Sequence, residues 1–109
     1  MKTSQVLRAA RAKIEVPERW TKDAFARDAT GFPVYPRHRN AACWDIYGAL
    51  DVATDNEEAR HQATGALTAV TMWGLAYWQD NLSGTHAQAH PEVLAAFDKA
   101  IAEREAVGD

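Results

Sequence analysis

A chain of 109 residues is long enough for one small domain, and a separate second core would have little to bury. Its formal net charge of −3, with acidic and basic residues interspersed, argues against general attraction to a nucleic-acid backbone. The single cysteine excludes an internal disulfide and a structural zinc site built from several cysteines.

Apolar residues make up 47% of the chain, but many are alanine, so the four tryptophans must supply much of the core volume. Such a thin core favours self-association or a stabilising partner. The first residues interleave Lys and Arg with apolar positions, unlike a signal peptide. The longest apolar stretch, residues 66–78, is shorter than the roughly 20 residues of a membrane helix. We expect a cytoplasmic protein with no membrane segment and no cofactor.

The first predicted helix covers residues 4–15, where apolar and basic residues alternate at helical spacing and Pro17 follows shortly after the end. A hairpin-like segment is predicted over residues 22–35, with a turn from Asp28 to Gly31 and a short strand on either side. Pro33 and Pro36 would confine any such strand to a sheet edge.

The next two helices are predicted over residues 41–54 and 56–78. Asn40 is a plausible N-cap for the earlier of them, which carries a regular apolar stripe. Asp55 and Glu58 form a capping-box pattern ahead of the later one. Past Leu67 this later helix is apolar on most faces, so its second half is expected to be buried and central.

The last predicted helix covers residues 91–107, with Pro91 at its first position, where a missing N–H costs nothing. In the loop before it, Thr85 or His90 is expected to cap the helix. The expected fold is therefore mainly α: one domain over residues 1–109, with four helices around the third and a short β-hairpin between the first two.

Asp80, His86 and His90 form a candidate metal site. The two histidines are four residues apart, a spacing that lets both imidazoles reach one metal when they share a helix face. A helix that starts near Pro91 leaves His86 in the preceding loop, and the stretch is then an ordinary connection between helices.

Arg37, His38 and Arg39 form the one dense basic stretch. They precede the start of the helix predicted over residues 41–54, where free backbone N–H groups can bind a phosphate or carboxylate. The same three residues can also contact nucleic acid locally, although a solvated turn has the same composition.

Three tryptophans are candidate interface residues: Trp20, Trp44 and Trp78. Aromatic side chains at the surface of a small domain make good anchors for a partner, and Trp20 lies in an irregular segment between basic residues. No catalytic constellation is recognisable, because Cys43 has no base beside it in sequence and neither serine lies in a nucleophile-elbow pattern.

Several segments carry a family resemblance. They are "RWTKDAFARDATGFPV", the helix "AACWDIYGAL", an aromatic and Asp/Asn loop, and "EVLAAFDKAI", in this order. The chain thereby resembles the uncharacterised bacterial and phage domain-of-unknown-function family 6197. The matching residues are Ala26, Arg27, Asp28, Gly31, Pro33 and Val34 in the first segment, and Gly48, Ala49 and Leu50 in the helix. The resemblance implies a small helical cytoplasmic protein, often carried by phages or mobile elements, and it implies no activity.

These observations favour a non-enzymatic accessory or regulatory module, of bacterial or phage origin, that binds another protein or itself. The alternative is a small-ligand, anion or metal-binding protein, with or without enzymatic activity, that uses the 80–90 loop or the 37–40 turn.

Overall fold

The computed structural model describes residues 1–109 and contains five α-helices and one two-stranded sheet. The helices are α1 (Thr3–Lys13), α2 (Ile46–Ala53), α3 (Glu57–Thr71), α4 (Leu75–Asp80) and α5 (His86–Ala106). A 3₁₀ turn, η1 (Pro17–Arg19), and the strands β1 (Ala26–Asp28) and β2 (Ala41–Trp44) lie between α1 and α2. The mainly α prediction with an antiparallel hairpin is thus confirmed in outline, although the helices number five rather than four.

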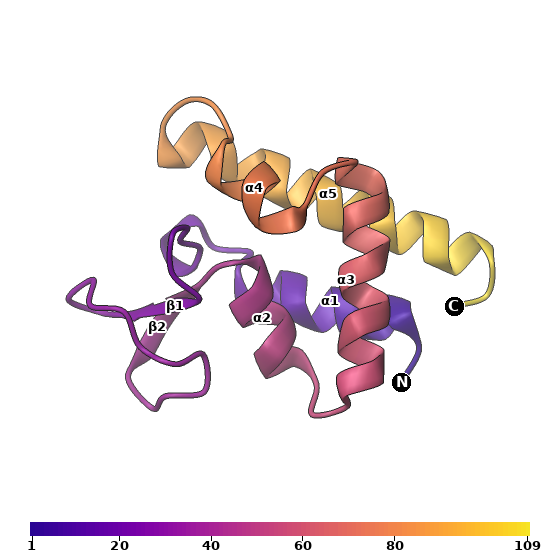
Figure 1. Cartoon of the computed structure of the whole chain (residues 1–109), viewed down its shortest axis with the longest axis horizontal. Coiled ribbons are helices and arrows are strands. Elements are labelled where there is room, and N and C mark those ends of the chain that lie inside the picture. The colour runs from indigo at the N-terminus through magenta and orange to yellow at the C-terminus, as the bar shows by residue number, and fades with distance from the viewer.

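The hairpin projects from the helices at the end of the molecule opposite the chain termini (Figure 1). Its predicted turn is present, since Asp28 Oδ1 accepts hydrogen bonds from the backbone N–H groups of Thr30 and Phe32, and Gly31 has a φ of 90°. Pro33 bridges Arg27 at the sheet edge. The main partner of β1, however, is β2 rather than the residues just after the turn.

Residues 41–44 form β2, so the helix expected to begin at 41 begins at Ile46 instead. Asp45 and not Asn40 is the N-cap, because its Oδ1 accepts a hydrogen bond of 2.7 Å from the N–H of Gly48. Pairing with β1 satisfies the backbone of this alanine-rich stretch and overrides its helix propensity.

Gly48 is required where α2 meets the hairpin. A Cβ at this position would collide with the backbone carbonyl oxygen of Phe25. The same carbonyl accepts a hydrogen bond of 3.2 Å from the N–H of Asp45, so β1 and the start of α2 lie in backbone contact.

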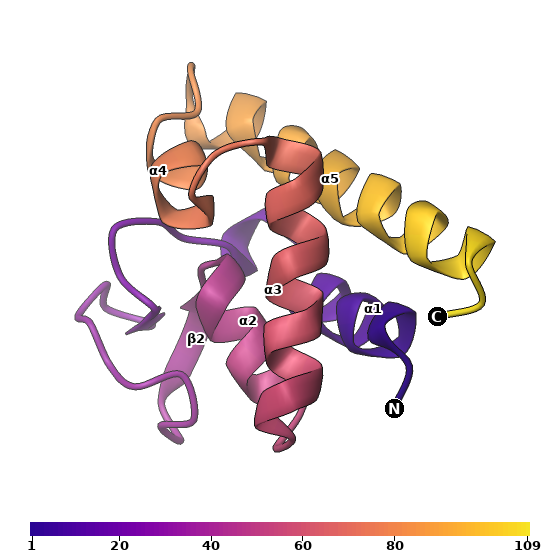
Figure 2. The same cartoon turned by 45° about the vertical axis from the view of Figure 1, so that its right-hand side comes forward.

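The helix predicted over residues 56–78 is broken at Met72 into α3 and α4 (Figure 2). Its N-cap is Asn56, whose side chain accepts from the N–H of Ala59, in place of the expected Asp55 pair. Met72 adopts a left-handed conformation with a φ of 63°, and Gly74 follows as the N-cap of α4. The stretch after Leu67 is therefore not the uniformly buried helix that we expected.

The last helix begins at His86 rather than at residue 91, which places Pro91 inside it. Thr85 and Gln88 form a capping box: Thr85 Oγ1 accepts from the N–H of Gln88, and Gln88 Oε1 accepts from the N–H of Thr85. The predicted cap at Thr85 is confirmed. Pro91 lies at the sixth position of the helix and has no N–H to donate to the carbonyl four residues earlier.

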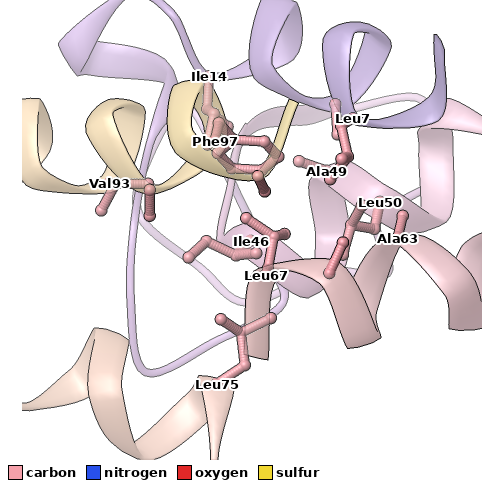
Figure 3. Close-up of a cluster of buried hydrophobic side chains, with 14 of the residues drawn as sticks. Leu7, Ile14, Ile46, Ala49, Leu50, Ala63, Leu67, Leu75, Val93 and Phe97 are labelled. Atoms are coloured by element: carbon pink, nitrogen blue, oxygen red, sulfur yellow. The ribbon is translucent and has the colours of Figure 1, made fainter. Parts of the chain in front are cut away.

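One hydrophobic core joins α1, α2, α3, α4 and α5, and α1 and α3 each pack against α2 and α5 as well as against each other. The core is therefore shared between the first and third helices rather than centred on the third. Figure 3 shows Phe97 of α5 close to Ile14, the residue that follows α1, with Ile46 and Leu67 nearby. None of the helices combines the length and apolar character that a membrane crossing requires.

Replacing Met72 by glycine is expected to raise the free energy of unfolding by about 1 kcal/mol, because glycine adopts a positive φ without strain from a Cβ. Little packing is lost, since the Met72 side chain is exposed. Ala69→Gly, at an exposed position inside α3, is the matched control and should lower the same free energy by about 1 kcal/mol. Urea unfolding measures both, and equal destabilisation by the two glycines would contradict the prediction.

Candidate functional site

A buried glutamine joins three segments of the chain at the start of α2. Gln79 is 1% exposed, and its Oε1 accepts hydrogen bonds from Trp20 Nε1 (3.0 Å) and from the backbone N–H of Ile46 (2.9 Å). Its Nε2 donates to Asp45 Oδ2 over 3.3 Å. We call Trp20, Asp45, Ile46 and Gln79 the Gln79 node. It satisfies polar groups that would otherwise be buried without partners.

The Asp45 carboxylate is the one strongly perturbed acid of this node. Burial raises its pKa to about 6, helped by the nearby charge of Asp80, and the hydrogen bonds from Gly48 and Gln79 oppose the rise. A pKa near neutrality is a property of many general acids and bases. Both carboxylate oxygens of Asp45 are nevertheless occupied by protein donors, and the side chain faces the core. The arrangement therefore serves to hold α2 in place.

The predicted metal ligands His86 and His90 lie on one helix, four residues apart, yet their Nε2 atoms are bonded to backbone. His86 Nε2 lies 2.7 Å from the carbonyl oxygen of Pro17, and His90 Nε2 lies 2.7 Å from that of Ile14. Since a carbonyl only accepts, each Nε2 must carry the proton.

The two histidine rings also pack on Trp20, with ring centroids 4.9 Å and 6.1 Å away. These contacts of His86 and His90 hold the segment after α1 against α5. Asp80, the third candidate ligand, is exposed at the end of α4, and no group of three possible metal ligands gathers anywhere in the chain.

The basic turn lies at the C-terminus of α2 and not at its N-terminus. Arg37 pairs with Asp55 at 2.8 Å and with Asp51 at 3.6 Å, and it donates to the carbonyl oxygens of Asp51 and Thr54. The guanidinium thus caps the carbonyl end of the helix, where a cation is stabilising. Its charge is already matched by two carboxylates.

The other two basic-turn residues are solvent-exposed. His38 accepts a hydrogen bond at Nδ1 from the N–H of Asn40, which closes the turn. Arg39 is exposed beside it and makes no ion pair. The structure therefore brings His38 and Arg39 together at the surface but directs Arg37 toward α2.

The three candidate interface tryptophans differ in exposure. Trp20 is 2% exposed and belongs to the core, so it offers no surface to a partner. Trp44 is half-buried, donates from Nε1 to the Pro36 carbonyl oxygen, and lies 4.9 Å beneath Lys13 Nζ. Trp78 is half-buried against the core.

The exposed aromatic side chains lie elsewhere, on residues that the sequence did not single out. Phe25, Phe32 and Tyr35 project from the hairpin and are 62%, 69% and 82% exposed. We call these three residues the hairpin surface. Their signal in the sequence is the alternation of aromatics with Pro33 and Pro36, which keeps this segment out of regular structure that could bury them.

Two open pockets adjoin the hairpin surface and share Phe25 and Pro36. One of about 600 Å³ lies along residues 33–36 and also involves His38. The other, of about 510 Å³, reaches Tyr47, whose ring meets that of Phe25 edge-on at 6.3 Å. Both volumes fall in the range of ligand and side-chain pockets.

Comparison with known proteins identifies the family. A family of unknown function, DUF6197, matches residues 1–103, and the chain belongs to this family. No curated protein and no solved structure matches the chain.

Replacing Gln79 by leucine is expected to lower the free energy of unfolding by about 2–4 kcal/mol, because the Trp20 and Ile46 N–H groups and the Asp45 carboxylate lose their partner. Gln62→Leu is the matched control, since Gln62 is exposed and contributes a single long hydrogen bond to Arg104. Chemical denaturation measures both variants. A loss at Gln79 no larger than that at Gln62 would show that the node contributes nothing.

The stability of the protein is expected to depend on Asp45 in the acidic range. Its folded-state pKa of about 6 lies above the unfolded value of 3.8, so its stabilising contribution is complete at low pH and is lost as pH rises through 6. The predicted loss is roughly 3 kcal/mol between about pH 4 and about pH 7.

Asp45→Asn keeps the N-cap oxygen but cannot ionise. The difference in unfolding free energy between this variant and the parent, measured in urea across that pH range, isolates the contribution of Asp45. A difference that does not change with pH would contradict the assignment.

Proposed function

We propose that the protein is a non-enzymatic interaction module that docks a partner protein, or a second copy of itself, through the hairpin surface. Phe32 and Tyr35 are the observation that carries the proposal, because they are large apolar side chains held in the open by a well-defined turn. Buried aromatic anchors contribute much of the affinity in protein interfaces.

Hydrogen bonds hold the hairpin in one conformation, which favours a role in recognising a partner over a role as a connecting loop. The Arg27 guanidinium donates to Thr21 Oγ1, to the Gly31 carbonyl oxygen and to the Lys22 carbonyl oxygen at 3.0–3.3 Å. Within the turn, the Asp28 carboxylate accepts hydrogen bonds from the backbone N–H groups of Thr30 and Phe32. A preorganised surface loses less conformational entropy when it binds.

The same proposal covers the biological setting: an accessory or regulatory protein of bacterial or phage origin that acts in the cytoplasm. The formal net charge of −3 supports a protein partner over general nucleic-acid binding. The alternative of an anion or metal site has less support, since Arg37 is matched by Asp51 and Asp55, and His86 and His90 are bonded to backbone.

Photo-crosslinking tests the proposal. With p-benzoylphenylalanine in place of Tyr35, irradiation in cells of the source organism should give one discrete adduct, either a dimer or a complex with one other protein. The same group at Val107, which is 72% exposed and lies two residues from the C-terminus, at the end opposite the hairpin, is the matched control and should give none.

A second substitution links the adduct to the surface. Phe32→Ser should reduce the yield at position 35 by at least about tenfold, as expected for an interface anchor. Equal adducts at positions 35 and 107, or no effect of Phe32→Ser, would contradict the proposal.

A further inference from the structure

A small pocket lined by aromatic rings lies between the α3–α4 turn and α5. It measures about 310 Å³, and its walls include Trp73, Tyr77 and Trp78 together with Asn81 and Glu92. The Trp73 and Tyr77 ring centroids lie 6.0 Å apart with an interplanar angle of 40°, and both residues line the pocket. None of these residues belongs to the hairpin surface, so an inference about this pocket does not depend on the proposed function.

The turn at Met72 opens this pocket. The left-handed backbone at Met72 ends α3 and sends Trp73 outward, and Trp73 is 63% exposed and Tyr77 is 62% exposed. If α3 had continued through residue 72 as a regular helix, the chain after it would have taken another direction. The left-handed backbone at Met72 and the exposure of two large rings both cost free energy.

The pocket wall carries a single charged side chain, and it is negative. Glu92 lies in its wall and Asp80 is adjacent to Asn81, whereas no Lys or Arg occurs between Arg60 and Lys99. Asn81 donates its Nδ2 to the Tyr77 carbonyl oxygen, which leaves its own side-chain oxygen free to accept. The pocket thus combines aromatic faces, a carboxylate and an acceptor.

We propose that this pocket binds a small alkylated ammonium ion, of the quaternary ammonium type. Aromatic faces attract such cations through the ring quadrupole, and alkyl groups around the nitrogen suit an apolar wall. The carboxylate of Glu92 adds charge complementarity and disfavours anions. The volume matches a small head group better than a large ligand.

Choline chloride is the probe, and 3,3-dimethylbutan-1-ol, which has the same shape without the charge, is its matched control. In ¹⁵N-labelled protein, choline should shift the indole N–H signals of Trp73 and Trp78 saturably, with a dissociation constant on the order of millimolar. The Trp44 indole, which is bonded to Pro36, should not shift. The alcohol should bind about fivefold more weakly or worse, and sodium chloride at equal concentration should give no saturable shift.

Substitutions in the pocket test the assignment of its walls. Trp73→Leu and Tyr77→Leu should each weaken choline binding about tenfold, and Glu92→Gln should weaken it roughly threefold. These side chains are exposed, so each variant should still fold. Unchanged NMR signals from the core residues are the check that it does. Phe32→Leu on the hairpin surface is the control that should leave binding unchanged.

Three outcomes would overturn the proposal. Equal affinity for choline and the alcohol would make the pocket merely apolar. Unchanged binding in Trp73→Leu would place the cation elsewhere. A peptide carrying trimethyllysine that binds more than about tenfold tighter than choline would assign the pocket to a protein side chain instead of a small molecule.

Discussion

The amide side chain of Gln79 is the constraint on which the arrangement of the molecule depends. It accepts from Trp20 before the hairpin and from the backbone of Ile46 after it, and it donates to Asp45. Both ends of the segment that carries the hairpin are therefore fixed to α4 by a single side chain. The hairpin has few core residues of its own, so this anchoring, with the contact between Phe25 and Gly48, sets where its aromatic side chains point.

Periodic patterns predicted the parts of the fold whose stability is local. The apolar face of α1, the stripe of Ala49 and Leu50, and the Asp28–Gly31 turn each follow from spacing or turn chemistry and lie where they were expected. The strand at 41–44 did not follow, because its conformation depends on pairing with residues far along the chain. Gln79 was also missed, since a glutamine in a helical pattern indicates a solvent-facing position unless its distant partners are known.

The residues that carry the family resemblance have structural roles. Arg27 binds three oxygen atoms around the turn, Gly31 supplies a positive φ, and Gly48 admits the Phe25 carbonyl. Gly48 also lines the pocket of about 510 Å³, whose wall includes Asp51, Arg60 and His61. The resemblance therefore specifies how the hairpin is built and held against α2, and the chemistry of any partner or ligand has to be sought in the exposed side chains that this framework presents.

Those exposed side chains occupy positions at which folding alone would favour other residue types. A glycine at position 72 would relieve the backbone, and polar side chains at positions 32, 35, 73 and 77 would cost nothing in the core, because the present ones are largely exposed. Only 27 of the 109 residues are buried, so the core has little stability in reserve to offset such features. The strain at Met72 and the exposed rings are therefore the features on which both binding proposals are based.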